Sequence, residues 1–94
     1  MAATVDELTV QYEEGGDIIV KELDKQILSK GAWATVLYRY QEKNRTSGEF
    51  GPDKYVIRRY QKADGQYRPK SKFVISSAKQ AEMIVETLSG WVKA

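Results

Sequence analysis

The chain has 94 residues, of which 41% are hydrophobic and 30% charged, and this predicts one globular domain rather than a disordered segment. It contains no cysteine and no histidine, which excludes disulfides, thiolate metal sites and imidazole-based catalysis. The first residues lack the basic and apolar regions of a secretory signal, and no apolar run is as long as a membrane span, so we expect neither export nor a membrane.

The formal net charge of +2 conceals an uneven distribution along the chain. Residues 1–24 contain seven acids and one base, which gives −6, whereas residues 54–72 contain seven bases and one acid, which gives +6. A concentrated basic region is typical of a nucleic-acid-binding surface. The alternative is an exposed sheet face that has collected Lys and Arg without any partner.

Residues 1–16 are acidic and end in two glycines, so we predict a solvated, flexible arm that precedes a binding domain at 17–94. A weakly docked edge segment with one strand is the alternative, because Leu8, Val10 and Tyr12 alternate with polar residues. In either form, the acids of this arm could screen a basic sheet and compete with nucleic acid.

The next segments predict strands. Residues 17–29 mix strand and helix spacing, and we predict a strand that bends or breaks near Asp24. Residues 33–43 are rich in aromatic and β-branched side chains and predict a clear strand. Residues 44–53 predict a polar loop.

Alternation along the strand at 33–43 predicts that its side chains divide between two faces. One face carries Trp33, Thr35, Leu37 and Arg39, and the other carries Ala34, Val36, Tyr38 and Tyr40.

Residues 54–62 and 66–76 predict a β-hairpin closed by Asp64 and Gly65. Pro69 has no amide hydrogen to donate, so it marks a sheet edge or a bulge. Cations alternate with aromatic rings in this hairpin. Single-stranded nucleic acid is bound by this combination, because cations neutralise phosphates and flat rings stack on unpaired bases.

A helix is predicted to start at Ser77, where the hydroxyl can cap free amides and Gln80 completes a capping box. The helix ends at Gly90 or extends beyond it. Its apolar stripe consists of Ala81, Ile84, Val85 and Leu88. One helix covers only part of a four-stranded sheet, so we predict a homodimer whose interface contains Ile84, Val85, Leu88 and Trp91.

The residues from Lys54 to Leu88 resemble the transcriptional coactivator family called positive cofactor four. The resemblance rests on the run Ile57–Tyr60, the Asp64-Gly65 turn, the spacing of Pro69 to Lys72, and the Val74-Ile75-Ser76 entry into the helix. It is weaker at 33–40 and absent from 1–16. The family implies an α+β fold, in which a strongly curved four-stranded antiparallel sheet is followed by one C-terminal helix. Two subunits pair through their helices, and their sheets present grooves for single-stranded DNA.

The resemblance implies that Arg58, Arg68 and Lys72 contact DNA, and it implies the same less securely for Lys54. The predicted DNA-binding set also includes other hairpin residues and one residue of the preceding strand. The full set is Lys54, Arg58, Tyr60, Lys62, Arg68, Lys70, Lys72 and Arg39.

The chain departs from the family pattern at two positions. Gln61 stands where the family commonly has a stacking tryptophan, and Phe73 replaces a common glycine. Tyr60, Tyr40 or Trp33 could supply the missing ring, although core packing is favoured for Trp33. Arg59 should lie on the face opposite Arg58 and pair with an acid or another subunit.

The sequence therefore predicts a homodimeric, largely sequence-independent single-stranded DNA-binding protein that assists transcription, replication or repair. It is expected to be no enzyme and to need no cofactor or metal. The location would be cytoplasmic and nucleoid-associated in a bacterium, or nuclear in a eukaryote. Further partners would be transcription or replication proteins. Two alternatives stay open: a protein-interaction module that docks an acidic partner, and an RNA-binding variant of the same fold.

Overall fold

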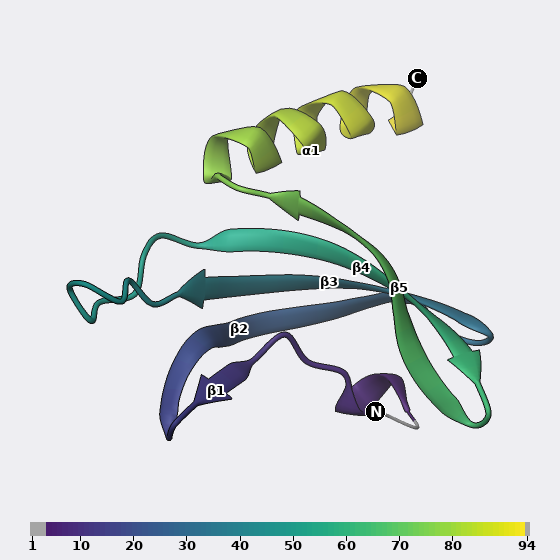
Figure 1. Cartoon of the computed structure of the whole chain (residues 1–94). Helices are drawn as coiled ribbons and strands as arrows, with labels where there is room; N and C mark the ends of the chain where they lie inside the picture. The colour runs from purple at the N-terminus through teal and green to yellow at the C-terminus, as the bar shows by residue number, and fades with distance from the viewer. Residues whose placement is uncertain (1–3, 94) are drawn as a thin grey trace.

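A computed structural model describes residues 4–93 as a short 3₁₀ turn, five strands and one C-terminal helix (Figure 1). The elements are η1 (Val5–Glu7), β1 (Tyr12–Glu14), β2 (Asp17–Ser29), β3 (Trp33–Glu42), β4 (Lys54–Ala63), β5 (Gln66–Ile75) and α1 (Ala78–Lys93). The strands form one antiparallel sheet in chain order, with β1 and β5 at its edges. This is the expected α+β arrangement of a curled sheet followed by a helix. The prediction of four strands is wrong, because residues 12–14 add a fifth.

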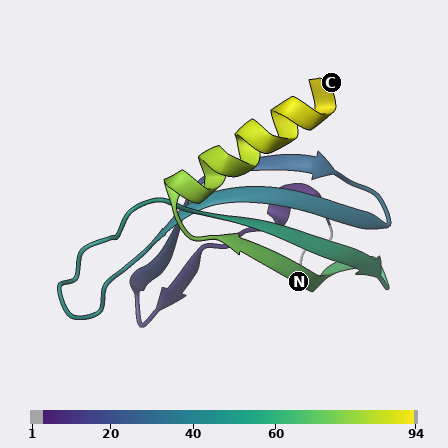
Figure 2. The same cartoon turned by 90° about the horizontal axis from the view of Figure 1, so that it is seen from above.

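The sheet curls so that one face is concave and the other convex (Figure 1). The segment that contains η1 lies under the concave face, and α1 lies on the convex side (Figures 1 and 2). The two ends of the described chain are therefore on opposite sides of the sheet.

Local chemistry explains the shape of the strands. The register of β2 against β3 shifts between Glu22 and Asp24, so the bend expected near Asp24 is a bulge within a continuous strand. Asp64 and Gly65 have φ values of 52° and 77°, as a two-residue type I′ hairpin turn requires. The register of β4 against β5 also shifts where Tyr60 faces Pro69, which confirms the bulge or edge position expected of that proline.

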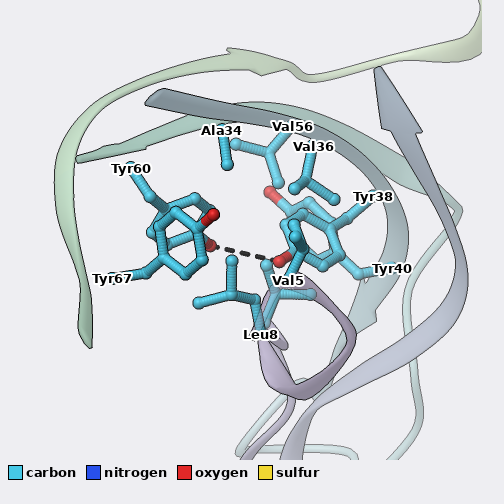
Figure 3. Packing of buried hydrophobic residues seen from close by; sticks show 10 residues of the cluster. Val5, Leu8, Ala34, Val36, Tyr38, Tyr40, Val56, Tyr60 and Tyr67 are labelled. Atoms are coloured by element: carbon cyan, nitrogen blue, oxygen red, sulfur yellow. Dashed lines mark hydrogen bonds between the residues drawn. The ribbon is translucent and has the colours of Figure 1, made fainter. Parts of the chain in front are cut away.

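The core lies between the concave face and the N-terminal segment (Figure 3). Alternation along β3 buries the side chains of Ala34, Val36, Tyr38 and Tyr40, which confirms the predicted division of this strand into two faces. β4 contributes Val56 and Tyr60, and β5 contributes Tyr67. From the N-terminal segment, Val5, Leu8 and Val10 complete the cluster.

Residues 5–10 are therefore docked on the sheet, which agrees with the alternative of a docked edge segment rather than with a solvated arm. The Lys25 ammonium group donates hydrogen bonds to the backbone oxygens of Val5, Asp6 and Leu8 at 2.8, 3.0 and 2.6 Å. On the next part of the segment, Glu22 accepts hydrogen bonds from the Thr9 hydroxyl at 2.6 Å and from the Val10 amide at 3.3 Å. These two side chains of β2 hold the backbone of the segment against the sheet.

Helix α1 begins as the sequence indicates and has little contact with its own sheet. The Gln80 amide donates to the Ser77 hydroxyl at 3.2 Å, while the Gln80 side chain accepts from the Ser76 amide at 3.2 Å. The helix continues through Gly90 to Lys93, and none of its described residues is buried. No helix among residues 4–93 is long and apolar enough to cross a membrane.

Candidate nucleic-acid interface

The cations of the β4–β5 hairpin divide between the two faces of the sheet. Arg58 lies between Val36 on β3 and Lys72 on β5, and it therefore shares the concave face with the core. Arg59 is on the convex face, as expected. Gln61 pairs with Arg68, so Arg68 also belongs to the convex face. The structure thus brings together Arg58 and Lys72 but not Arg68, which the family resemblance groups with them.

Three hollows in the surface meet at Arg58. The first, of about 420 Å³, separates residues 9–12 from the strands and is lined there by Arg58, Lys72 and Val74. The second, of about 300 Å³, follows the β5 edge and is lined by Arg58 and the four residues 69–72. The third, of about 370 Å³, lies between residues 7–9 and the strands. We call this continuous depression the Arg58 groove, defined by Arg58, Pro69, Lys70, Ser71 and Lys72 with Thr9, Val10 and Gln11 as its opposite wall.

The three cations of the Arg58 groove form no ion pair within the described residues, although Glu7 and Glu42 also line parts of the hollows. Within residues 4–93, no carboxylate lies within ion-pair distance of Arg58, Lys70 or Lys72. Lys70 and Lys72 are exposed, and Arg58 is half-buried. The Arg58 Nε is buried without a hydrogen-bond partner among the described residues. A buried donor without an acceptor is unfavourable, so this Nε lowers the stability of the fold at the groove.

Four other predicted DNA-binding cations already have partners. The Lys54 ammonium group lies 2.6 Å from the Glu42 carboxylate, and this hydrogen bond raises the pKa of Lys54. Arg39 lies 3.8 Å from Asp53, and Arg68 lies 3.9 Å from Asp64. The Lys62 ammonium group lies 5.5 Å from the centre of the Tyr67 ring. These four residues are less available to phosphate than Lys70 and Lys72, although ion pairs at an exposed surface are weak.

The structure differs most from the sequence prediction at the aromatic residues that were expected to stack on bases. Tyr60 is only 2% exposed, and its hydroxyl lies 3.1 Å from the Tyr38 hydroxyl inside the core (Figure 3). Tyr40 is buried too. Neither ring offers a stacking face in this conformation. The sequence favours the core for Trp33, but 42% of this residue is exposed, and the Arg59 guanidinium lies 4.7 Å from its ring centre.

The predicted dimer residues lie on the open side of α1. Ile84 is half-buried, whereas Val85, Leu88 and Trp91 are exposed. Sequence reasoning missed Met83, which is also an exposed apolar residue of this helix. It also missed Thr9 and Gln11 as wall residues of the Arg58 groove, because no pattern in the segment signals where its backbone docks.

Residues 4–93 contain no group of three or more Asp and Glu side chains that could together hold a metal ion. Comparison with known protein families, with curated proteins and with solved structures finds no match for this chain. The Arg58 groove, the exposed helix α1 and the sequence from Lys54 to Leu88 are therefore the features of this chain that point to a function.

Proposed function

We propose that the chain is a homodimeric, largely sequence-independent single-stranded DNA-binding protein of the positive cofactor four type. The observation that carries the proposal is the Arg58 groove, where Arg58, Lys70 and Lys72 line one depression and none of them forms an ion pair within the described chain. A phosphate backbone supplies negative charge here, and its oxygens can accept hydrogen bonds from the exposed Lys70 and Lys72 ammonium groups.

The shape of the groove favours a single strand over a duplex. Its walls are the β5 edge on one side and the docked N-terminal segment on the other. Helix α1 does not enter it, since α1 lies on the convex side (Figures 1 and 2). Duplex DNA is usually read by a helix or ribbon that projects into a groove of the DNA. A flexible single strand can instead follow a shallow basic depression across a sheet.

The second part of the proposal is that two copies associate through α1. The described chain measures 47 × 39 × 17 Å with a radius of gyration of 15.0 Å, whereas a compact chain of this length has about 12 Å. The convex face also has an open apolar row, in which Leu37, Ile57 and Phe73 are neighbours across three strands. A second copy would cover this row and the apolar face of α1 together.

We place such a protein among the accessory factors of transcription, replication or repair, which act where duplex DNA is opened. A single experiment tests the binding proposal. A labelled thymine oligonucleotide of about twenty nucleotides is titrated with protein at several salt concentrations, and binding is followed by fluorescence anisotropy. We expect the affinity for the oligonucleotide to fall as the salt concentration rises. Unlabelled duplex should displace the labelled strand only poorly. The absence of binding at low salt would refute the proposal, and equal competition by duplex would refute its single-strand specificity.

A further inference from the structure

The convex face carries an exposed aromatic ring surrounded by hydrogen-bond donors. Trp33 on β3 pairs in register with Gln61 on β4, and Gln61 pairs with Arg68 on β5. The neighbouring row of the sheet carries Arg59, whose guanidinium covers part of the indole at 4.7 Å from the ring centre. We call Trp33, Arg59, Gln61 and Arg68 the Trp33 patch. It lies on the opposite face from the Arg58 groove.

Trp33 differs from the other rings of the sheet. Tyr38, Tyr40, Tyr60 and Tyr67 are buried in the concave core. Exposed Tyr12 lies beside two glutamates in β1, and exposed Phe73 lies in the apolar row with Ile57 and Leu37. Of the rings that β1–β5 expose, Trp33 is the one with a cation over its face. A flat ring stacked against a guanidinium is a common platform for the bases of single-stranded nucleic acid.

We propose that Trp33 stacks on a base of the bound single strand. This inference rests on the proposed function and names a subsite of the same ligand. The base lies on the part of the indole that Arg59 leaves open, or it displaces the guanidinium and stacks in its place. Gln61 presents an amide toward the base edge, and Arg68 presents donors toward a phosphate.

The strand reaches this subsite over the edge of the sheet. β5 is an edge strand, and its bulge lies at Pro69 and Lys70, which line the Arg58 groove at that edge. Trp33 lies two strands in from that edge, a separation of about 10 Å. Phosphates held by Lys70 and Lys72 therefore anchor the strand within reach of the indole.

Two readouts test this subsite. In a Trp91→Phe background, Trp33 is the only tryptophan in the chain. Its emission should be quenched by an unlabelled thymine oligonucleotide, with saturation at the same ratio as the anisotropy titration. Replacement of Trp33 by Ala should weaken binding about five- to 150-fold, because stacking contributes that much per base. It should leave the dependence of affinity on salt unchanged, since no phosphate contact is lost.

An oligonucleotide of the same length without bases separates stacking from a structural effect. If Trp33 stacks, Trp33→Ala and the unsubstituted protein bind the abasic strand equally, and Trp33→Phe retains most of the affinity for the thymine strand. Equal weakening on both strands would mean that the substitution acts through the fold, and this would overturn the inference. So would normal binding of Trp33→Ala without quenching in the single-tryptophan protein. In the last case the Arg58 groove would still stand as the binding site, whereas no binding by any variant would refute the proposed function itself.

Discussion

At the scale of single residues, Arg58 and Trp33 show what the sequence could and could not predict. Strand alternation correctly placed Arg58 and Arg59 on opposite faces, because it depends only on neighbours along the chain. Whether a face is covered depends on segments far away in sequence. The concave face is covered by residues 5–10, which buries Tyr60 and Tyr40, and the convex face is left open at Trp33. Alternation alone therefore could not distinguish the buried rings from the exposed one.

The buried tyrosine pair gives a prediction at this scale. Burial, reinforced by the Tyr60 hydroxyl, raises the pKa of Tyr38 far above its ordinary value. Below about pH 10 the Tyr38 phenol is neutral in both the folded and the unfolded chain, so its contribution to the stability of the fold is fully present. As the pH rises further, the unfolded chain ionises Tyr38 while the folded chain does not, so stability is lost.

Replacement of Tyr38 by Phe should therefore make the alkaline fall in stability shallower. At neutral pH the same change should cost about 1 kcal/mol, because the Tyr60 hydroxyl loses its partner in the core. Urea unfolding at pH 7 and at about pH 10.5 measures both effects. The control is Tyr12→Phe, which removes a tyrosine hydroxyl at an exposed position outside the core. An alkaline fall as steep in Tyr38→Phe as in the unsubstituted protein would contradict the assignment.

At the scale of elements, the strands β3, β4 and β5 could be predicted because their patterns are local. Alternating β-branched and aromatic residues, an Asp-Gly turn and a capped helix start each act over a few residues. The N-terminal segment has only a short alternation, at Leu8, Val10 and Tyr12. Val5, Leu8 and Val10 together fit neither helical nor strand spacing, and their burial depends on Lys25 binding three backbone oxygens of the segment. The alternation of Leu8, Val10 and Tyr12 allowed one strand in this segment, but the strand that forms is β1, which begins at Tyr12 and has three exposed residues.

Leu8 tests the docking of this segment. Replacement of Leu8 by Ala should reduce the free energy of unfolding by about 2–5 kcal/mol, because it opens a cavity beside the core tyrosines. Asp6→Ala is the matched control, since the Asp6 side chain is exposed and only its backbone oxygen binds Lys25. That control should change stability by less than about 0.5 kcal/mol. Equal effects of the two substitutions, measured by urea unfolding, would mean that residues 5–10 are not part of the core.

At the scale of the whole molecule, the sheet covers one of its faces with its own N-terminal segment and leaves the helix and the convex face open. Exposed apolar residues on α1 include Met83, Val85, Leu88, Trp91 and Val92. A helix of 16 residues gains most of its stability from packing its apolar face against another surface, and α1 has no buried residue among those described. In our account that partner is a second copy of the chain.

Replacement of Leu88 by Glu should disrupt the dimer, because it places a charge in the centre of the apolar face of α1. Size-exclusion chromatography with light scattering should give twice the chain mass for the unsubstituted protein and the chain mass for Leu88→Glu. Lys79→Glu adds an acid at an exposed position outside the apolar stripe, and it should remain a dimer. A monomer of unsubstituted protein at high concentration would refute association through α1.

The salt dependence of oligonucleotide binding, measured after the Arg58 groove loses charge, tests whether phosphates bind in this groove. Lys70→Gln with Lys72→Gln removes two exposed cations from the groove, and Lys79→Gln with Lys93→Gln removes two from α1. If phosphates bind in the groove, the first pair lowers the magnitude of the slope of log affinity against log salt by about 1.4 for a strand that crosses one site. The second pair should leave that slope unchanged. Equal slopes for the two double variants would contradict the assignment of this groove as the DNA-binding site.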